Sequence, residues 1–109
     1  MKLSDQTIIA PEKITQYLLK WQPDNDKSKF LNHAGYIIEN WQQLVHDIRS
    51  QVLPLEAKLV RKTHYGDMYE IRTSLVGPNG VSLKIVTVWM IECKSKQTKF
   101  ITLFPDREA

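Results

Sequence analysis

The chain has 109 residues, 42% of them hydrophobic and 25% charged, which is the composition of one ordinary globular domain. Its formal net charge is +3, and its single cysteine, Cys93, excludes an internal disulfide and hence the small disulfide-stabilised secreted class. The N-terminus has no secretory leader pattern, and no apolar run has membrane-spanning length. We therefore expect a soluble cytoplasmic protein with no membrane contact.

The first predicted element is a helix that begins at Pro11 and ends before Pro23. Proline suits the first helical turn, where its missing N–H is not needed, and it ends a helix that reaches it from within. Apolar residues recur in this segment at helical spacing, at Ile14, Leu18 and Trp21. These three positions predict a stripe that faces the core.

Two more helices are predicted before residue 54. Cap-forming residues at 24–29 introduce a short helix over about 26–34, and Gly35 follows where a left-handed C-terminal residue belongs. A third helix is predicted over about 38–53, where Pro54 ends it. Its apolar positions at helical spacing are Ile38, Trp41, Leu44, Val45 and Ile48.

Beyond residue 56 the hydrophobic period changes to two, which predicts strands. The four candidate strands are about 57–64, 68–76, 81–91 and 99–104. The third is apolar on both faces and is expected to be central. The predicted fold class is α+β: one domain over 1–109, with two to three helices (about 11–53) packed on one face of a four-stranded antiparallel meander (about 57–105).

The Asn79-Gly80 pair predicts a two-residue hairpin turn between the second and third strands, because both residues tolerate a positive φ. This turn fixes the register of the hairpin. The expected partners on the helix-covered side are Ile71 with Val88, Tyr69 with Met90, and Thr73 with Val86.

The same register predicts an opposite sheet face rich in aromatic residues. If Ile101 and Leu103 of the last strand are buried, its neighbours join that face, whose expected members are Glu70, Arg72, Thr87, Trp89, Phe100, Thr102 and Phe104. Three large aromatic side chains on an exposed face indicate an interface or a binding groove. Two alternatives remain open: a loop or the C-terminal tail covers the face, or two copies dimerise through it.

No motif names a reaction. His33, His46 and His64 do not have the spacing of metal ligands, and neither a phosphate-binding loop nor a nucleophile elbow is present. Cys93 follows a strand beside Lys94, where an inert thiol is favoured over a reactive one. We therefore expect neither a metal nor a cofactor.

The basic residues favour an anionic partner. Residues 57–109 hold 9 Lys and Arg against 5 Asp and Glu, whereas residues 1–56 hold 6 against 7. An unevenly charged, solvated surface is the alternative, but the excess is compatible with a polyanion such as RNA.

Metal-independent RNA cleavage requires a base, an acid and a cation near the phosphate. In this hypothesis His64 is the base, Tyr65 and Thr102 orient groups, and Arg72 and Lys84 contact phosphate. The remaining predicted substrate contacts are Glu70, Trp89, Phe100 and Phe104, the three aromatic rings stacking on bases. The alternative is that these polar residues form ordinary surface pairs.

Motifs along nearly the full length resemble a bacterial domain-of-unknown-function family, number 6883. They are Lys29-Phe30, Gly35-Tyr36, Asn40-Trp41, Tyr65-Gly66, Pro78-Asn79-Gly80, Val88-Trp89 and Thr102-Leu103-Phe104-Pro105. At the level of the fold, helices followed by a meander that ends in Thr-x-x-Pro resemble the barnase, EndoU, colicin D and RelE-like ribonucleases. EndoU-like enzymes use two histidines and a lysine, and only Thr102 and Pro105 match their pattern here.

The ribonuclease resemblance implies a toxin-like domain of a toxin–antitoxin or polymorphic toxin system that acts on RNA. A small antitoxin or immunity protein would then cover the same sheet face. The alternative function is a non-catalytic interaction module, in which this face binds a protein partner or a second copy of the chain.

Overall fold

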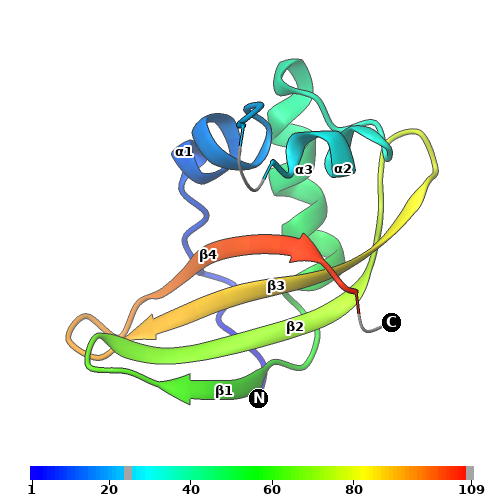
Figure 1. Ribbon diagram of the computed structural model, residues 1–109. Helices are drawn as coiled ribbons and strands as arrows, with labels where there is room; N and C mark the ends of the chain where they lie inside the picture. Colours follow the sequence, from blue (N-terminus) through cyan, green and yellow to red (C-terminus); the bar gives the residue numbers. More distant parts are fainter. Residues whose placement is uncertain (24–25, 108–109) are drawn as a thin grey trace.

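The computed structural model describes residues 1–23 and 26–107, so the helix caps predicted at 24 and 25 lie outside the described residues. A layer of short helices packs against one face of a four-stranded antiparallel sheet, with α1 and α2 beside β4 (Figure 1). This arrangement confirms the predicted α+β fold.

The first helix is shorter than expected. It consists of α1 (Pro11–Lys13) and the π-helical η1 (Ile14–Leu18), in which the Leu19 N–H donates to the Ile14 carbonyl at 2.9 Å. The prediction that Trp21 belongs to the buried stripe is wrong. Since the helix ends at Leu18, Trp21 follows it with 61% of its surface exposed.

The other helices lie where the sequence predicts them. α2 (Ser28–Asn32) is bounded at its start by Asp26, whose carboxylate accepts backbone N–H bonds from Ser28 and Lys29 at 3.4 and 3.3 Å. Gly35 follows with φ of 93°, as expected. The third helix is continuous but mixed, and its parts are η2 (Ile38–Asn40), α3 (Trp41–Asp47) and η3 (Ile48–Val52).

The four strands form a meander in sequence order, β1-β2-β3-β4. Their bounds are β1 (Lys58–Lys62), β2 (Gly66–Val76), β3 (Ser82–Glu92) and β4 (Thr98–Pro105). β3 is hydrogen-bonded on both sides, to β2 and β4. The prediction of a central third strand is confirmed.

The β2–β3 turn differs from the prediction by one residue. The Gly77 N–H donates to the Val81 carbonyl and the Gly80 N–H to the Gly77 carbonyl, both at 3.0 Å, and Gly80 has φ of 87°. Because Asn79 keeps a negative φ, the loop is a type I turn over Pro78 and Asn79 closed by a left-handed glycine. Proline at the second position of a type I turn favours this longer loop.

This shift of one residue exchanges the faces of β3. Tyr69 now lies opposite Trp89 rather than Met90, and Ile71 lies opposite Thr87 rather than Val88. The prediction that Trp89 and Thr87 lie on the open face is therefore wrong. Both are 0% exposed and face the helices.

A bulge in β4 also moves the Phe100 side chain to the face opposite the predicted one. Thr102 lies opposite Val88 and Phe100 opposite Trp89, so Ile101 has no partner on β3. The extra residue re-aims the strand, as bulges do, and turns Phe100 into the core, where it is 2% exposed. As predicted, Thr102 and Phe104 stay on the face away from the helices, but their partners there are Val88 and Val86, which were expected on the other face.

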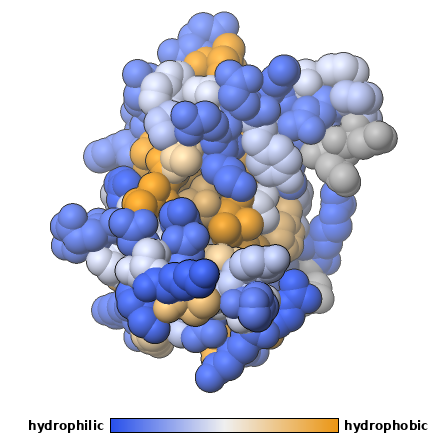
Figure 2. Space-filling model, turned by 90° about the vertical axis from the view of Figure 1, so that its left-hand side faces the viewer, coloured by the Kyte–Doolittle hydropathy of each residue, from blue (hydrophilic) through white to orange (hydrophobic). Residues whose placement is uncertain are grey.

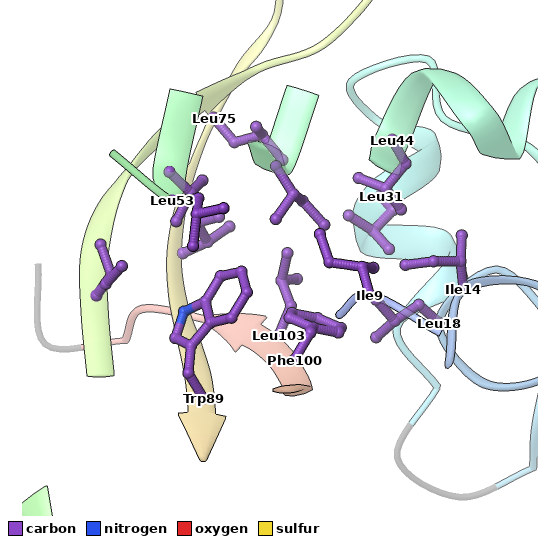
Figure 3. Close-up of a cluster of buried hydrophobic side chains, with 14 of the residues drawn as sticks. Ile9, Ile14, Leu18, Leu31, Leu44, Leu53, Leu75, Trp89, Phe100 and Leu103 are labelled. Atoms are coloured by element: carbon purple, nitrogen blue, oxygen red, sulfur yellow. The ribbon is translucent and has the colours of Figure 1, made fainter. Parts of the chain in front are cut away.

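Trp89 and Phe100 pack edge to face at the centre of the core, with ring centroids 5.2 Å apart (Figure 3). The indole N–H donates to the Thr87 hydroxyl at 2.8 Å, and that hydroxyl donates to the Ile71 carbonyl at 3.1 Å. The tryptophan can be fully buried because its polar atom has this partner. The helices contribute the opposite wall, at Ile14, Leu18, Leu31 and Leu44.

The segment before α1 joins the two edges of the molecule. The Ala57 N–H donates to the Met1 carbonyl at 2.8 Å, and the Phe100 N–H donates to the Ile8 carbonyl at the same distance. On the side shown in Figure 2, hydrophobic residues gather between the helical layer and the strand ends, with hydrophilic residues around them. None of the helices in the described ranges is long and apolar enough to cross a membrane.

The β2–β3 turn also packs on the residues that follow α2. The Asn79 N–H donates to the Ala34 carbonyl at 3.3 Å, and the Asn79 side chain donates to the His33 carbonyl at 3.0 Å. A Cβ atom at Gly77 would overlap the Ala34 carbonyl oxygen. The turn and the end of α2 are therefore in direct backbone contact.

Candidate functional site

A groove of about 810 Å³ lies between the start of α2 and the adjoining ends of β3 and β4. Four chain segments meet there: the start of the helix, the middle of β2, the first half of β3, and the end of β4 with the residues after it. The lining residues are Asp26, Lys27, Phe30, Arg72, Ser82, Leu83, Lys84, Val86, Phe104, Pro105, Asp106 and Arg107.

Strand pairing explains why these side chains meet. Arg72 lies opposite Val86, and Val86 lies opposite Phe104, so the three form a row across β2, β3 and β4. Lys84 is two residues from Val86 and therefore shares its face. The observed register thus places a guanidinium, an aromatic ring and an ammonium group along one side of the groove.

Cations outnumber carboxylates in the groove. Lys27, Arg72, Lys84 and Arg107 carry four positive charges, against two negative charges on Asp26 and Asp106. Arg72 donates to Asp106 at 2.9 Å and to Glu70 at 3.4 Å, which orients its guanidinium on the sheet. The surplus of positive charge suits an anionic ligand.

A hydrogen-bonded group from three elements adjoins this groove. The Lys27 ammonium donates to the Tyr17 phenol oxygen at 2.5 Å and lies 3.5 Å from the Thr102 hydroxyl. Hydrogen bonds from Lys27 and Thr102 lower the pKa of Tyr17, although partial burial opposes the shift. The site therefore contains a tyrosine whose deprotonated form is stabilised.

A second hollow lies at the opposite end of the sheet. It has a volume of about 240 Å³ and is lined by His64, Tyr65, Glu92, Cys93, Lys94 and Ser95. The His64 and Tyr65 rings meet edge to face at 5.6 Å, and the Cys93 thiol donates to the His64 carbonyl at 3.4 Å. These contacts join the β1–β2 turn to the β3–β4 turn.

The structure divides the predicted site residues among three places. Arg72, Lys84 and Phe104 line the groove and Thr102 adjoins it, with Glu70 bonded to Arg72. His64 and Tyr65 line the other hollow. Because β2 rises about 3.3 Å per residue, the six steps from Gly66 to Arg72 span roughly 20 Å, and His64 lies in the turn before Gly66. Trp89 and Phe100 are in the core, where neither can contact a ligand.

Sequence reasoning did not single out four residues of this region as functional: Tyr17, Lys27, Phe30 and Arg107. Phe30 stands in the Lys29-Phe30 motif, which was a usable signal. Tyr17 and Lys27 are ten residues apart, and only the packing of α2 beside β4 brings them together. Across residues 1–23 and 26–107, no three His, Cys, Asp or Glu side chains form a group that could hold a metal ion.

Residues 2–107 match the family model described as "Domain of unknown function (DUF6883)". The chain belongs to this family. The predicted family membership is thereby confirmed over almost the whole length. No curated protein and no solved structure matches the chain. The resemblance to ribonuclease folds gains no support from these comparisons and stays a prediction.

Proposed function

We propose that this DUF6883 chain binds single-stranded RNA in the groove between α2 and the end of β4. The observation that carries the proposal is the placement of Arg72 and Phe104 on either side of the fully buried Val86, with Lys27 and Lys84 on the same groove. Arginine and lysine recognise phosphate groups, and aromatic rings stack on bases.

The shape of the site favours a single strand over a duplex. Phe30 of α2 and Phe104 of β4 both line the groove. Both rings are half-buried, so each presents part of its surface to the groove. Unpaired bases can reach such rings, whereas the stacked bases of a duplex cannot.

A toxin-like ribonuclease remains the proposed class of activity, with a small neutralising protein that covers the groove. The ribonuclease resemblance in the sequence supports this class. The geometry supports neither His64 as the base nor Tyr65 as an orienting residue, because both line a separate hollow. Cleavage in the groove would need a different proton acceptor.

The alternative of a non-catalytic interaction module rested on an exposed aromatic face. Two of its three aromatic residues, Trp89 and Phe100, are buried in the core, and Phe104 lines a cationic groove. This distribution favours an anionic ligand over an apolar protein surface.

The test is fluorescence anisotropy with a short labelled single-stranded RNA over a series of salt concentrations. We expect binding to weaken as salt rises, with a logarithmic slope of about −0.7 for each phosphate contact. Lys84→Gln should reduce that slope by about one contact. Lys62 on β1 is also exposed, so Lys62→Gln is the matched control and should leave the slope unchanged. An RNA affinity that does not change with salt concentration, or an equal change of slope in the two variants, would contradict the proposal.

A further inference from the structure

We propose that Tyr17 is the general base of an RNA-cleaving site beside the groove, with Lys27 and Thr102 as the residues that hold its phenolate. This inference rests on the proposed function, since it places the reacting ribose next to the phosphate-binding residues. The juxtaposition that carries it is the meeting of Tyr17 from η1 and Thr102 from β4 at the ammonium of Lys27, which precedes α2.

Lys27 makes the contacts that connect the Tyr17 phenol to Thr102 and to the groove. Lys27 approaches Tyr17 in two ways, because its ammonium donates to the phenol oxygen at 2.5 Å and lies 4.5 Å from the ring centroid. The same ammonium reaches the Thr102 hydroxyl at 3.5 Å. Lys27 is also a lining residue of the groove, so it connects Tyr17 to the place where phosphate would bind.

The backbone holds Tyr17 and Lys27 in this geometry. Tyr17 belongs to the π-helical turn η1, a rare conformation that is common at functional sites. The Gln22 side chain donates to the Tyr17 carbonyl at 3.0 Å, and the Gln22 N–H donates to Asp26 at 3.1 Å. Gln22 therefore ties the turn that carries Tyr17 to the segment that carries Lys27.

The surroundings favour the ionised phenol. Hydrogen bonds from Lys27 and Thr102 lower the pKa of Tyr17, and the charges of Lys27 and Lys13 act in the same direction against the effect of burial. A general base must be partly deprotonated at the working pH, and it is most effective when its pKa lies near that pH. A lowered tyrosine pKa meets this requirement better than an ordinary one.

The reaction balances without a metal or a further reactant. The Tyr17 phenolate takes the proton of a ribose 2′-hydroxyl, and the 2′-oxygen forms a bond to the adjacent phosphorus. The bond from phosphorus to the 5′-oxygen of the next nucleotide breaks, and that oxygen takes a proton from water. The products are a 2′,3′-cyclic phosphate and a free 5′-hydroxyl, while the groove cations stabilise the charge on the phosphorane.

The test measures binding and cleavage of one single-stranded RNA by the same preparations. We expect the full chain to yield a 2′,3′-cyclic phosphate end, and an oligonucleotide with 2′-deoxyribose throughout to resist. Tyr17→Phe should retain RNA binding within about two-fold and lose at least about 100-fold in cleavage rate, the lower end of a general base's contribution. Tyr65→Phe, in the other hollow, is the matched control and should cleave normally.

A second readout separates the base from a structural role. Cleavage should increase with pH until Tyr17 is ionised, and Lys27→Gln should move that midpoint to higher pH. In a pH titration without RNA, the tyrosinate absorbance of the unmodified chain should contain a transition that Tyr17→Phe lacks. The midpoint of this transition should equal the midpoint of the pH dependence of cleavage. RNA binding without cleavage by the unmodified chain, or cleavage that survives Tyr17→Phe, would overturn this inference and leave the proposed RNA binding intact. Absence of RNA binding would overturn both.

Discussion

The two faces of the sheet use aromatic residues for opposite purposes. On the helix-covered face, Trp89 and Phe100 are buried against each other, and the indole N–H is bonded to Thr87. On the other face, Phe104 and Arg72 flank the buried Val86 and line an open groove. Trp89 and Phe100 therefore stabilise the fold, whereas Phe104 is available to a ligand.

The difference teaches that residue type alone does not identify a site. Histidine and cysteine lie together in the smaller hollow, but their contact joins two turns, and the charges there are one of each sign, on Glu92 and Lys94. The groove contains less distinctive residues, yet four segments of the chain converge on it. Three substitutions test this contrast, and the largest expected effect comes first.

Trp89→Ala should lower the free energy of unfolding by about 3–5 kcal/mol, because it opens a large cavity in the core. Urea denaturation followed by circular dichroism measures the change. The matched control is Phe104→Ala, on the opposite face and half-buried, which should cost less than half as much. If the two variants lose equal stability, the assignment of separate roles to the two faces fails.

Thr87→Val should lower the free energy of unfolding by about 1–3 kcal/mol, because it leaves the Trp89 N–H buried without a partner. Thr87→Ser keeps the hydroxyl and removes one methyl group, so it should cost about 0.8 kcal/mol. Thermal and urea unfolding of the two variants separate these contributions. A valine variant as stable as the serine variant would show that the hydrogen bond contributes little.

Glu70→Gln should have the smallest effect on stability, and it should increase RNA affinity. The ion pair from Arg72 to Glu70 is partly exposed, and such pairs contribute at most about 1 kcal/mol. Stability should change little, and RNA affinity should rise about two-fold as a negative charge beside the groove is removed. Glu92→Gln at the other end of β3 is the control for the anisotropy titration. A fall in affinity would place Glu70 in the ligand site.

The sequence predicts the architecture well because periodicity and breakers act locally. The period-two segments and the prolines at 11 and 54 place the strands and helix ends within a few residues. The faces of β3 depend on a single loop residue, so Pro78 in a type I turn is enough to reverse the prediction for Trp89. The bulge that reverses Phe100 has no signal of its own in the strand pattern.

The candidate site is predicted only in part, for a different reason. Arg72, Lys84, Thr102 and Phe104 belong to a sheet whose pairing can be worked out from the chain, and they do come together around the groove. Tyr17 and Lys27 come from the helical layer, and their place depends on how that layer sits on the edge of β4. Tertiary packing of this kind cannot be read from local patterns.

The backbone contact between the β2–β3 turn and the end of α2 makes the two long hairpins unequal sites for engineering. The exposed tip at residues 94–96, beyond the contacts of Cys93 with the β1–β2 turn, should accept an inserted epitope tag without loss of folding. An insertion at 78–80 would part Asn79 from the Ala34 carbonyl and displace the helix that carries Phe30. The turn that looks like a spare surface loop is therefore bonded to the backbone that directly follows the helix carrying Phe30.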